Sequence, residues 1–87
     1  SSAASDVYKR QSLTSGNKVA FILQSDSSSD SFKAGLEDSK GKRIYVQTSN
    51  GWIDHRFSIE QSGSYKIFLE GTTSKSIHIT GSITILK

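Results

Sequence analysis

His55 and His78 are the two histidines of this 87-residue chain, and imidazole is the side chain best suited to proton transfer near neutral pH. Asp54 directly precedes His55, which suggests a carboxylate–imidazole pair of the kind that orients a catalytic histidine. If both residues lie in one strand, however, neighbouring side chains point to opposite faces and cannot hydrogen-bond to each other. The many serines include none in a G-x-S-x-G turn. The sequence therefore predicts a protein that is not an enzyme and has no cofactor.

Metal binding has equally little support from the spacing of possible ligands. His55, His78 and Asp54 follow no zinc-ligand pattern. Asp26 and Asp30 lie in the serine-rich segment SDSSSDS and could offer oxygens to Ca²⁺. The segment lacks the D-x-D-x-D-G arrangement, and a calcium ion needs about six to eight oxygen ligands. We therefore predict a structural loop and no metal site, with Asp26 and Asp30 as weak calcium candidates.

Three aromatic residues occupy positions where a strand would hold them on its outer face. Tyr45 and Phe68 fall on the outward phase of their segments, and Trp52 directly follows a turn signal. Outward aromatic rings beside polar side chains can stack on sugar rings or anchor a protein partner. The binding candidates are therefore Trp52, Tyr45 and Phe68, with Asp54 and His55 as polar neighbours. The alternative is that a second sheet or a missing strand covers these rings.

Other aromatic residues are predicted to have structural roles. Phe21, Phe32 and Phe57 fall on inward phases and are expected in the core. Tyr65 follows Gly63 in the segment SGSY and opens a predicted strand. This placement resembles a tyrosine corner, in which the tyrosine hydroxyl bonds back to nearby backbone.

The elements that must position these residues are strands, because period-two alternation runs through the chain. No segment carries a helical stripe, and KVAFILQS is apolar on both faces, as in a central strand. Short alternating segments separated by turn residues predict an all-β fold, an antiparallel β-sandwich of about seven strands with a jelly-roll-like or immunoglobulin-like arrangement. The seven segments are KVAFILQS, SFKAGLED, RIYVQTS, HRFSIE, SYKIFLEG, SIHITG and SITILK.

Two glycine positions indicate how the strands connect. Asn50-Gly51 is the strongest hairpin signal in the chain, because a type I′ turn requires positive φ at both central positions. Gly81, inside HITGSIT, marks either a tight turn or a bulge that bends one long strand.

The first eleven residues, SSAASDVYKRQ, resemble a transposase-based sequencing adapter (a transposon end) translated in one reading frame, because every residue matches an adapter codon. Segments of this kind are excluded from fold reasoning. Residues 1–11 are therefore expected to lie outside the fold, and residues 12–87 are expected to form a single, N-terminally truncated domain. Deleting residues 1–11 is then expected to leave the melting temperature unchanged within about a degree.

Net charge and composition limit the kinds of partner that the chain is expected to bind. The chain carries a net charge of +3, and the charge is +2 without Asp6, Lys9 and Arg10, which is too weak to indicate nucleic acid. The basic segment KGKR, residues 40–43, is expected to be a solvated turn. There is no Cys, so no disulfide forms, and no run approaches the roughly 20 apolar residues of a membrane span.

The segment FSIEQSGSYKIFLEGTTSKSIHITGSITI, residues 57–85, resembles small secreted or cell-surface β-sandwich modules of Gram-positive gut bacteria. Pre-peptidase C-terminal domains have similar spacing. The resemblance implies an exported β-sandwich and carries over no functional residue. The matching positions are Gly63, Tyr65, Ile67, Leu69, Ile77, Ile79, Gly81 and Ile83.

Together these features predict a non-catalytic, exported binding or accessory module at the bacterial cell surface. Its expected partner is a glycan or an envelope polymer, contacted through the outward aromatic residues. The alternative is a structural spacer or protein-interaction domain that packs against a neighbouring domain and binds no small ligand. Neither nucleic acid nor a membrane span is expected.

Overall fold

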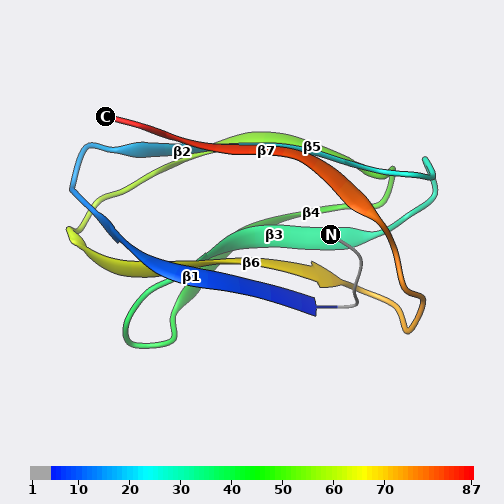
Figure 1. The fold of residues 1–87 in the computed structure, drawn as a ribbon, viewed down its shortest axis with the longest axis horizontal. Coiled ribbons are helices and arrows are strands. Elements are labelled where there is room, and N and C mark those ends of the chain that lie inside the picture. The colour runs from blue at the N-terminus through cyan, green and yellow to red at the C-terminus, as the bar shows by residue number, and fades with distance from the viewer. Residues whose placement is uncertain (1–4) are drawn as a thin grey trace.

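The computed structural model describes the backbone of residues 5–87 and the side chains of residues 10–87, and this part contains seven strands. None of its segments is a helix long and apolar enough to cross a membrane. Two antiparallel sheets, ordered β1-β6-β3-β4 and β5-β2-β7, lie face to face (Figure 1), which confirms the predicted antiparallel β-sandwich. The strands are β1 Ser5–Leu13, β2 Lys18–Ser25, β3 Phe32–Glu37, β4 Arg43–Thr48, β5 Trp52–Ser58, β6 Gly63–Gly71 and β7 Ile79–Leu86.

The core lies between the sheets and is built from alternate residues of each strand. Val19 and Phe21 of β2 are fully buried, as are Phe32 and Leu36 of β3. Phe57 of β5 packs edge to face on Phe21, with ring centroids 5.3 Å apart. The three phenylalanines predicted to be internal are therefore in the core, where removal of apolar area from water stabilises the sandwich.

The strand β2 is central in its sheet, as its apolar sequence predicted, but only one of its faces is covered. On the other face Ile22 is 49% exposed and Ala20 is half-buried. The second apolar face of β2 therefore contributes to an open surface of the molecule.

Every connection between the described strands except the β3–β4 hairpin passes from one sheet to the other. The β4–β5 connection does so at Asn50-Gly51, so the predicted hairpin there is wrong. A type I′ turn needs positive φ at both residues, whereas only Gly51 has it, at 77°. Gly51 packs so closely on the β2–β3 connection that a Cβ would lie 2.2 Å from the Ser27 carbonyl oxygen. The pair is a corner between the two sheets.

Residues 76–87, predicted as two short strands, contain the single strand β7. Gly81 has a φ of 139° and lies opposite Leu23 of β2 without a register shift. Gly81 therefore lies within one long strand, as one of the two alternatives predicted, but the bulge predicted with it is absent from the β2–β7 register.

One strand of the structure was not among the predicted segments, and this strand is β1. It pairs with β6 from Ser5 to Leu13, with an irregularity between Val7 and Arg10. Residues 5–11 thus belong to the sheet, which corrects the expectation that the whole of residues 1–11 lies outside the fold. The strand was missed because the adapter resemblance excluded residues 1–11 from fold reasoning. Backbone groups at a sheet edge can pair with almost any extended segment, whatever its side chains. Residues 1–4 lie outside the described residues, and the adapter origin of residues 1–11 stays a prediction.

Tyr65 forms the predicted tyrosine corner. Its Oη donates a hydrogen bond to the carbonyl oxygen of Gln61, at 2.6 Å. The bond ties the β5–β6 connection to the first residues of β6.

Candidate functional site

The most exposed aromatic side chain among the described residues is that of Trp52, which is 53% exposed at the start of β5. Its backbone is fixed at the corner between the sheets, because its N–H bonds to the Asn50 side chain and the Gly51 carbonyl accepts the N–H of Ser25. Strand alternation then directs Trp52 to the outer face of the three-stranded sheet. The register places Gln24 of β2 beside it.

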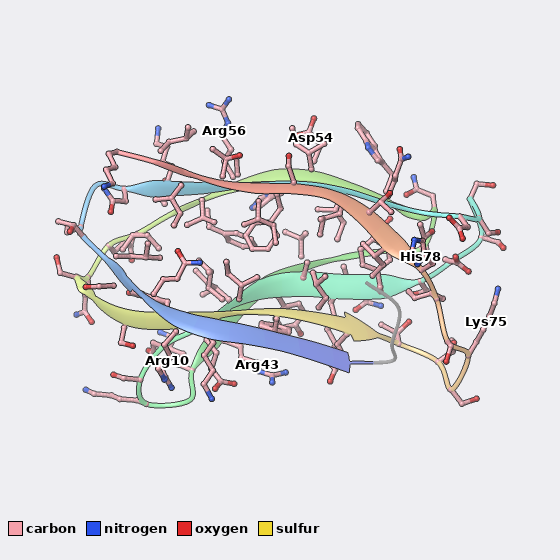
Figure 2. The ribbon with its side chains drawn as sticks, viewed as in Figure 1. Arg10, Arg43, Asp54, Arg56, Lys75 and His78 are labelled. Carbon is pink, nitrogen blue, oxygen red and sulfur yellow. The ribbon has the colours of Figure 1, made fainter. Side chains whose placement is uncertain are left out.

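On the outer face of the three-stranded sheet, polar side chains lie beside Trp52 and in the next row. Gln24 lies between Trp52 and Thr80, and in the next row Ile22 lies between Asp54 and Ser82. Figure 2 shows Asp54, together with Arg56, projecting from this sheet away from the core. We call this surface the Trp52 face; it consists of Ile22, Gln24, Trp52, Asp54, Thr80 and Ser82.

The Trp52 face combines a flat aromatic ring with amide, hydroxyl and carboxylate groups. An indole ring offers an apolar surface to the C–H face of a sugar, and the polar groups around it can hydrogen-bond to hydroxyls. Neighbouring strands lie about 4.8 Å apart, so Trp52, Gln24 and Thr80 form a row roughly 10 Å long across the sheet. Sequence alone could not join these residues, because their proximity depends on the register of β2, β5 and β7.

His55 does not belong to the Trp52 face. It follows Asp54 in β5, lies opposite Phe21, and packs its ring on Phe57 with centroids 4.6 Å apart. The two neighbouring polar side chains therefore lie on opposite faces of the strand, and Asp54 does not orient the imidazole. His78, the other histidine, is exposed just before β7, where the connection from β6 enters that strand (Figure 2).

Tyr45 and Phe68 lie on the outer face of the other sheet. Both stand opposite Gly35 of β3, and their ring centroids are 6.4 Å apart. Tyr45 is 49% exposed, but Phe68 is only 1% exposed. The Arg43 guanidinium covers the Phe68 ring at 4.2 Å.

The prediction of Phe68 as a surface residue is therefore wrong, although its strand face was predicted correctly. The absence of a side chain at Gly35 lets its neighbours close over the ring. The five binding candidates also do not form one site. Trp52 and Asp54 share one face, Tyr45 lies on the opposite side of the sandwich, and His55 lies at an edge.

The two calcium candidates differ in their surroundings. Asp26 is exposed, whereas Asp30 is buried and accepts a hydrogen bond from the Lys75 Nζ at 3.0 Å. That hydrogen bond is the main reason why the pKa of the Asp30 carboxyl lies below its ordinary value. No group of three or more potential metal ligands occurs among the described residues. The carboxylate of Asp30 thus connects the β2–β3 loop to the β6–β7 loop. Lys75 is too distant in sequence for this pairing to have been predicted.

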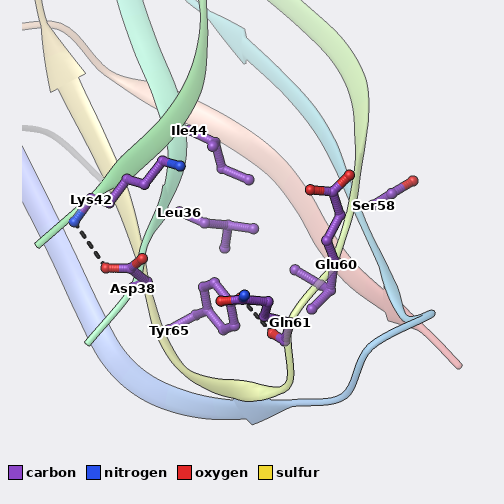
Figure 3. Close-up of a pocket in the computed structure, with 9 residues that line it drawn as sticks. Leu36, Asp38, Lys42, Ile44, Ser58, Glu60, Gln61 and Tyr65 are labelled. Atoms are coloured by element: carbon purple, nitrogen blue, oxygen red, sulfur yellow. Dashed lines mark hydrogen bonds between the residues drawn. The ribbon is translucent and has the colours of Figure 1, made fainter. Parts of the chain in front are cut away.

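A pocket of about 450 Å³ opens between the β3–β4 turn and the β5–β6 connection (Figure 3). Leu36, Ile44 and Ile59 give it an aliphatic wall. Asp38, at its rim, accepts the backbone N–H groups of Lys40 and Lys42, both at 2.9 Å, and so closes the basic turn. The remaining lining residues are polar or aromatic: Lys42, Ser58, Glu60, Gln61 and Tyr65.

Comparisons with known proteins add no family assignment. No protein-family model matches the chain, and no curated protein is significantly similar to it.

Proposed function

We propose that this domain is a non-catalytic module that binds a glycan through the Trp52 face. The observation that supports the proposal is a 53% exposed indole on an open sheet surface, flanked by Gln24 and Asp54. An exposed tryptophan leaves a large apolar area in water, and a pyranose ring stacked on it would remove that area from water. The polar side chains around it would supply the hydrogen bonds that orient the sugar.

Binding without catalysis suits the shape of the surface. Catalysis at a proton-transferring residue depends on a pocket that excludes water and brings reacting groups together. On the Trp52 face the groups lie on an exposed sheet surface, and the nearest histidine in the strand, His55, points to the other side. The proposal places the module outside the cell, at the bacterial surface, where envelope glycans are available.

The test uses the fact that Trp52 is the single tryptophan of the chain. Soluble oligosaccharides and polysaccharides are titrated into the protein while its intrinsic fluorescence is recorded. Stacking of a sugar on the indole is expected to shift the emission and to saturate. Affinity is then measured by isothermal titration calorimetry, which needs no tryptophan.

Trp52→Ala is expected to reduce the affinity at least about tenfold, since one stacked ring contributes 1.4 kcal/mol or more at a binding centre. Tyr45→Ala removes an exposed ring from the opposite side of the sandwich and is expected to leave the affinity for a short oligosaccharide unchanged. Equal binding by both variants and the parent protein would contradict the proposal. Failure of every glycan to bind would instead favour the spacer function.

A further inference from the structure

Four of the described strands lie at sheet edges: β1, β4, β5 and β7. Exposed edges tend to pair with other chains unless charges, bulges or bends prevent it. In β1 the register is interrupted between Val7 and Arg10, and β7 carries the positive φ of Gly81. In β5 the polar residues Asp54 and His55 occupy both faces of the strand.

The edge strand β4 lacks these protective features. It pairs with β3 through six consecutive residues without a bulge, from Thr48 opposite Phe32 to Arg43 opposite Glu37. Its centre is the β-branched and aromatic sequence Ile44-Tyr45-Val46, which favours extended backbone. The other edge of β4 has no strand partner among the described residues.

Beside β4 an aliphatic side chain of the inner face is left partly in water. Ile44 stands opposite the buried Leu36 and so lies on the inner face of the sheet, yet it is 38% exposed. The pocket of Figure 3 opens directly beside it, with Leu36 and Ile59 in the same wall. An inward-facing isoleucine with this exposure lies where one more strand would continue the sheet.

We propose that β4 pairs with β4 of a second copy of this chain, in antiparallel orientation about a two-fold axis. Opposed residues in an antiparallel pair share a face, so inner residues must meet inner residues. A register centred on Ile44-Tyr45-Val46 meets this requirement, and it places Tyr45 opposite Tyr45 of the second copy. Ile44 then lies opposite Val46, and Arg43 lies opposite Gln47.

The charges of β4 make it complementary to itself in this orientation. Its one charged residue, Arg43, is at the end of the strand, and it also pairs with Glu37 of its own chain at 2.9 Å. Antiparallel pairing brings each Arg43 beside an uncharged Gln47, whereas a parallel pair would bring the two cations together. Val46 of the second copy would cover Ile44, and the two four-stranded sheets would join into one.

The proposal is tested by sedimentation velocity over roughly a hundredfold range of protein concentration, because a dimer of this kind is populated by mass action. The expected result is a concentration-dependent shift from the 9.5 kDa chain to twice that mass. Gln47→Lys places two new cations opposite the two Arg43 side chains and is expected to raise the dimer dissociation constant about tenfold. Gln47→Glu is expected to lower it.

Gln47 also lies opposite Lys33 of its own chain, so each new charge acts on the fold of the single chain too. Melting curves of both variants measure that effect separately from the dissociation constant. Thr84→Lys and Thr84→Glu are matched controls, because Thr84 is an exposed residue of β7 in the other sheet. They are expected to leave the dissociation constant unchanged. A single 9.5 kDa species at every concentration would overturn the proposal. So would a dimer that responds to charge at Thr84 but not at Gln47.

Discussion

At the scale of single residues, Trp52 and Phe68 show the difference between the face of a side chain and its exposure. Both occupy outward positions of their strands. Trp52 begins an edge strand, where Gln24 is its one cross-strand neighbour. Phe68 lies on β6 between β1 and β3, opposite Gly35, and Arg43 folds over it. Period-two alternation therefore predicts which face a ring occupies, and the size of its neighbours decides whether water reaches it.

The same contrast exists between Phe68 and Tyr45, the two rings on the outer face of the four-stranded sheet. Their removal is therefore expected to lower the free energy of unfolding by different amounts. Phe68→Ala should lower the free energy of unfolding by about 3 kcal/mol, because it empties a buried site. Tyr45→Ala should cost about 1 kcal/mol, because the ring is half exposed. Urea denaturation of both variants measures the difference. Equal costs would mean that the Phe68 ring is not covered in solution.

At the scale of elements, the strands from β2 to β6 were predictable, whereas β1, the continuity of β7 and the connections between the sheets were not. Alternation in FKAGLE predicts β3, because burial on one face of a strand imposes that pattern, and the short apolar run of KVAFILQS predicts the central strand β2. Asn50-Gly51 predicted a hairpin, but the turn lies at a corner where Gly51 packs on Ser27, a contact between distant segments. The Trp52 face escaped prediction for the same reason. Its members come from three strands, and only Trp52 and Asp54 were recognised.

The strand β1 yields a prediction that separates two views of the N-terminus. Deletion of residues 1–11 removes most of β1, one of the two strands that pair with β6, so the melting temperature should fall by roughly 5 °C or more. Arg10→Gln is the matched control. It removes the weak hydrogen bonds from Arg10 to Ser64 and keeps the strand, so it should have little effect. A melting temperature unchanged within a degree after the deletion would support an N-terminal segment outside the fold.

At the scale of the whole molecule, three carboxyl groups link stability to pH. The pKa values of Asp30, Glu37 and Asp38 are lowered chiefly by hydrogen bonds from Lys75, Arg43 and the backbone of Lys42, respectively. A lowered pKa means that the ionised form stabilises the fold. That contribution is complete above the ordinary values of 3.8 to 4.5 and is lost as the pH falls through the lower values of the folded protein.

The chain should therefore keep its full stability above about pH 5 and lose it progressively in more acidic solution. Thermal melting from pH 7 to pH 2 measures this dependence. Asp30→Asn should make the acid-induced fall shallower, because one of the three groups no longer titrates. The same steepness in Asp30→Asn and the parent protein would show that the Asp30–Lys75 pair does not contribute.

Pairing through β4 would also change how the whole molecule binds. A dimer carries two Trp52 faces, and a polymer that reaches both is held more tightly than a short oligosaccharide, because the second contact is intramolecular. The gain depends on the polymer spanning the distance between the faces.

The claim on which the proposed function depends is that glycans bind at the Trp52 face. Chemical-shift mapping of the isotope-labelled protein, titrated with the glycan that binds most tightly, tests it residue by residue. The largest shifts are expected at Trp52, Gln24 and Thr80, with small shifts at Tyr45. Shifts gathered instead around Ile44 and Ile59, which line the pocket, would contradict the proposed site and would place the ligand between the sheets.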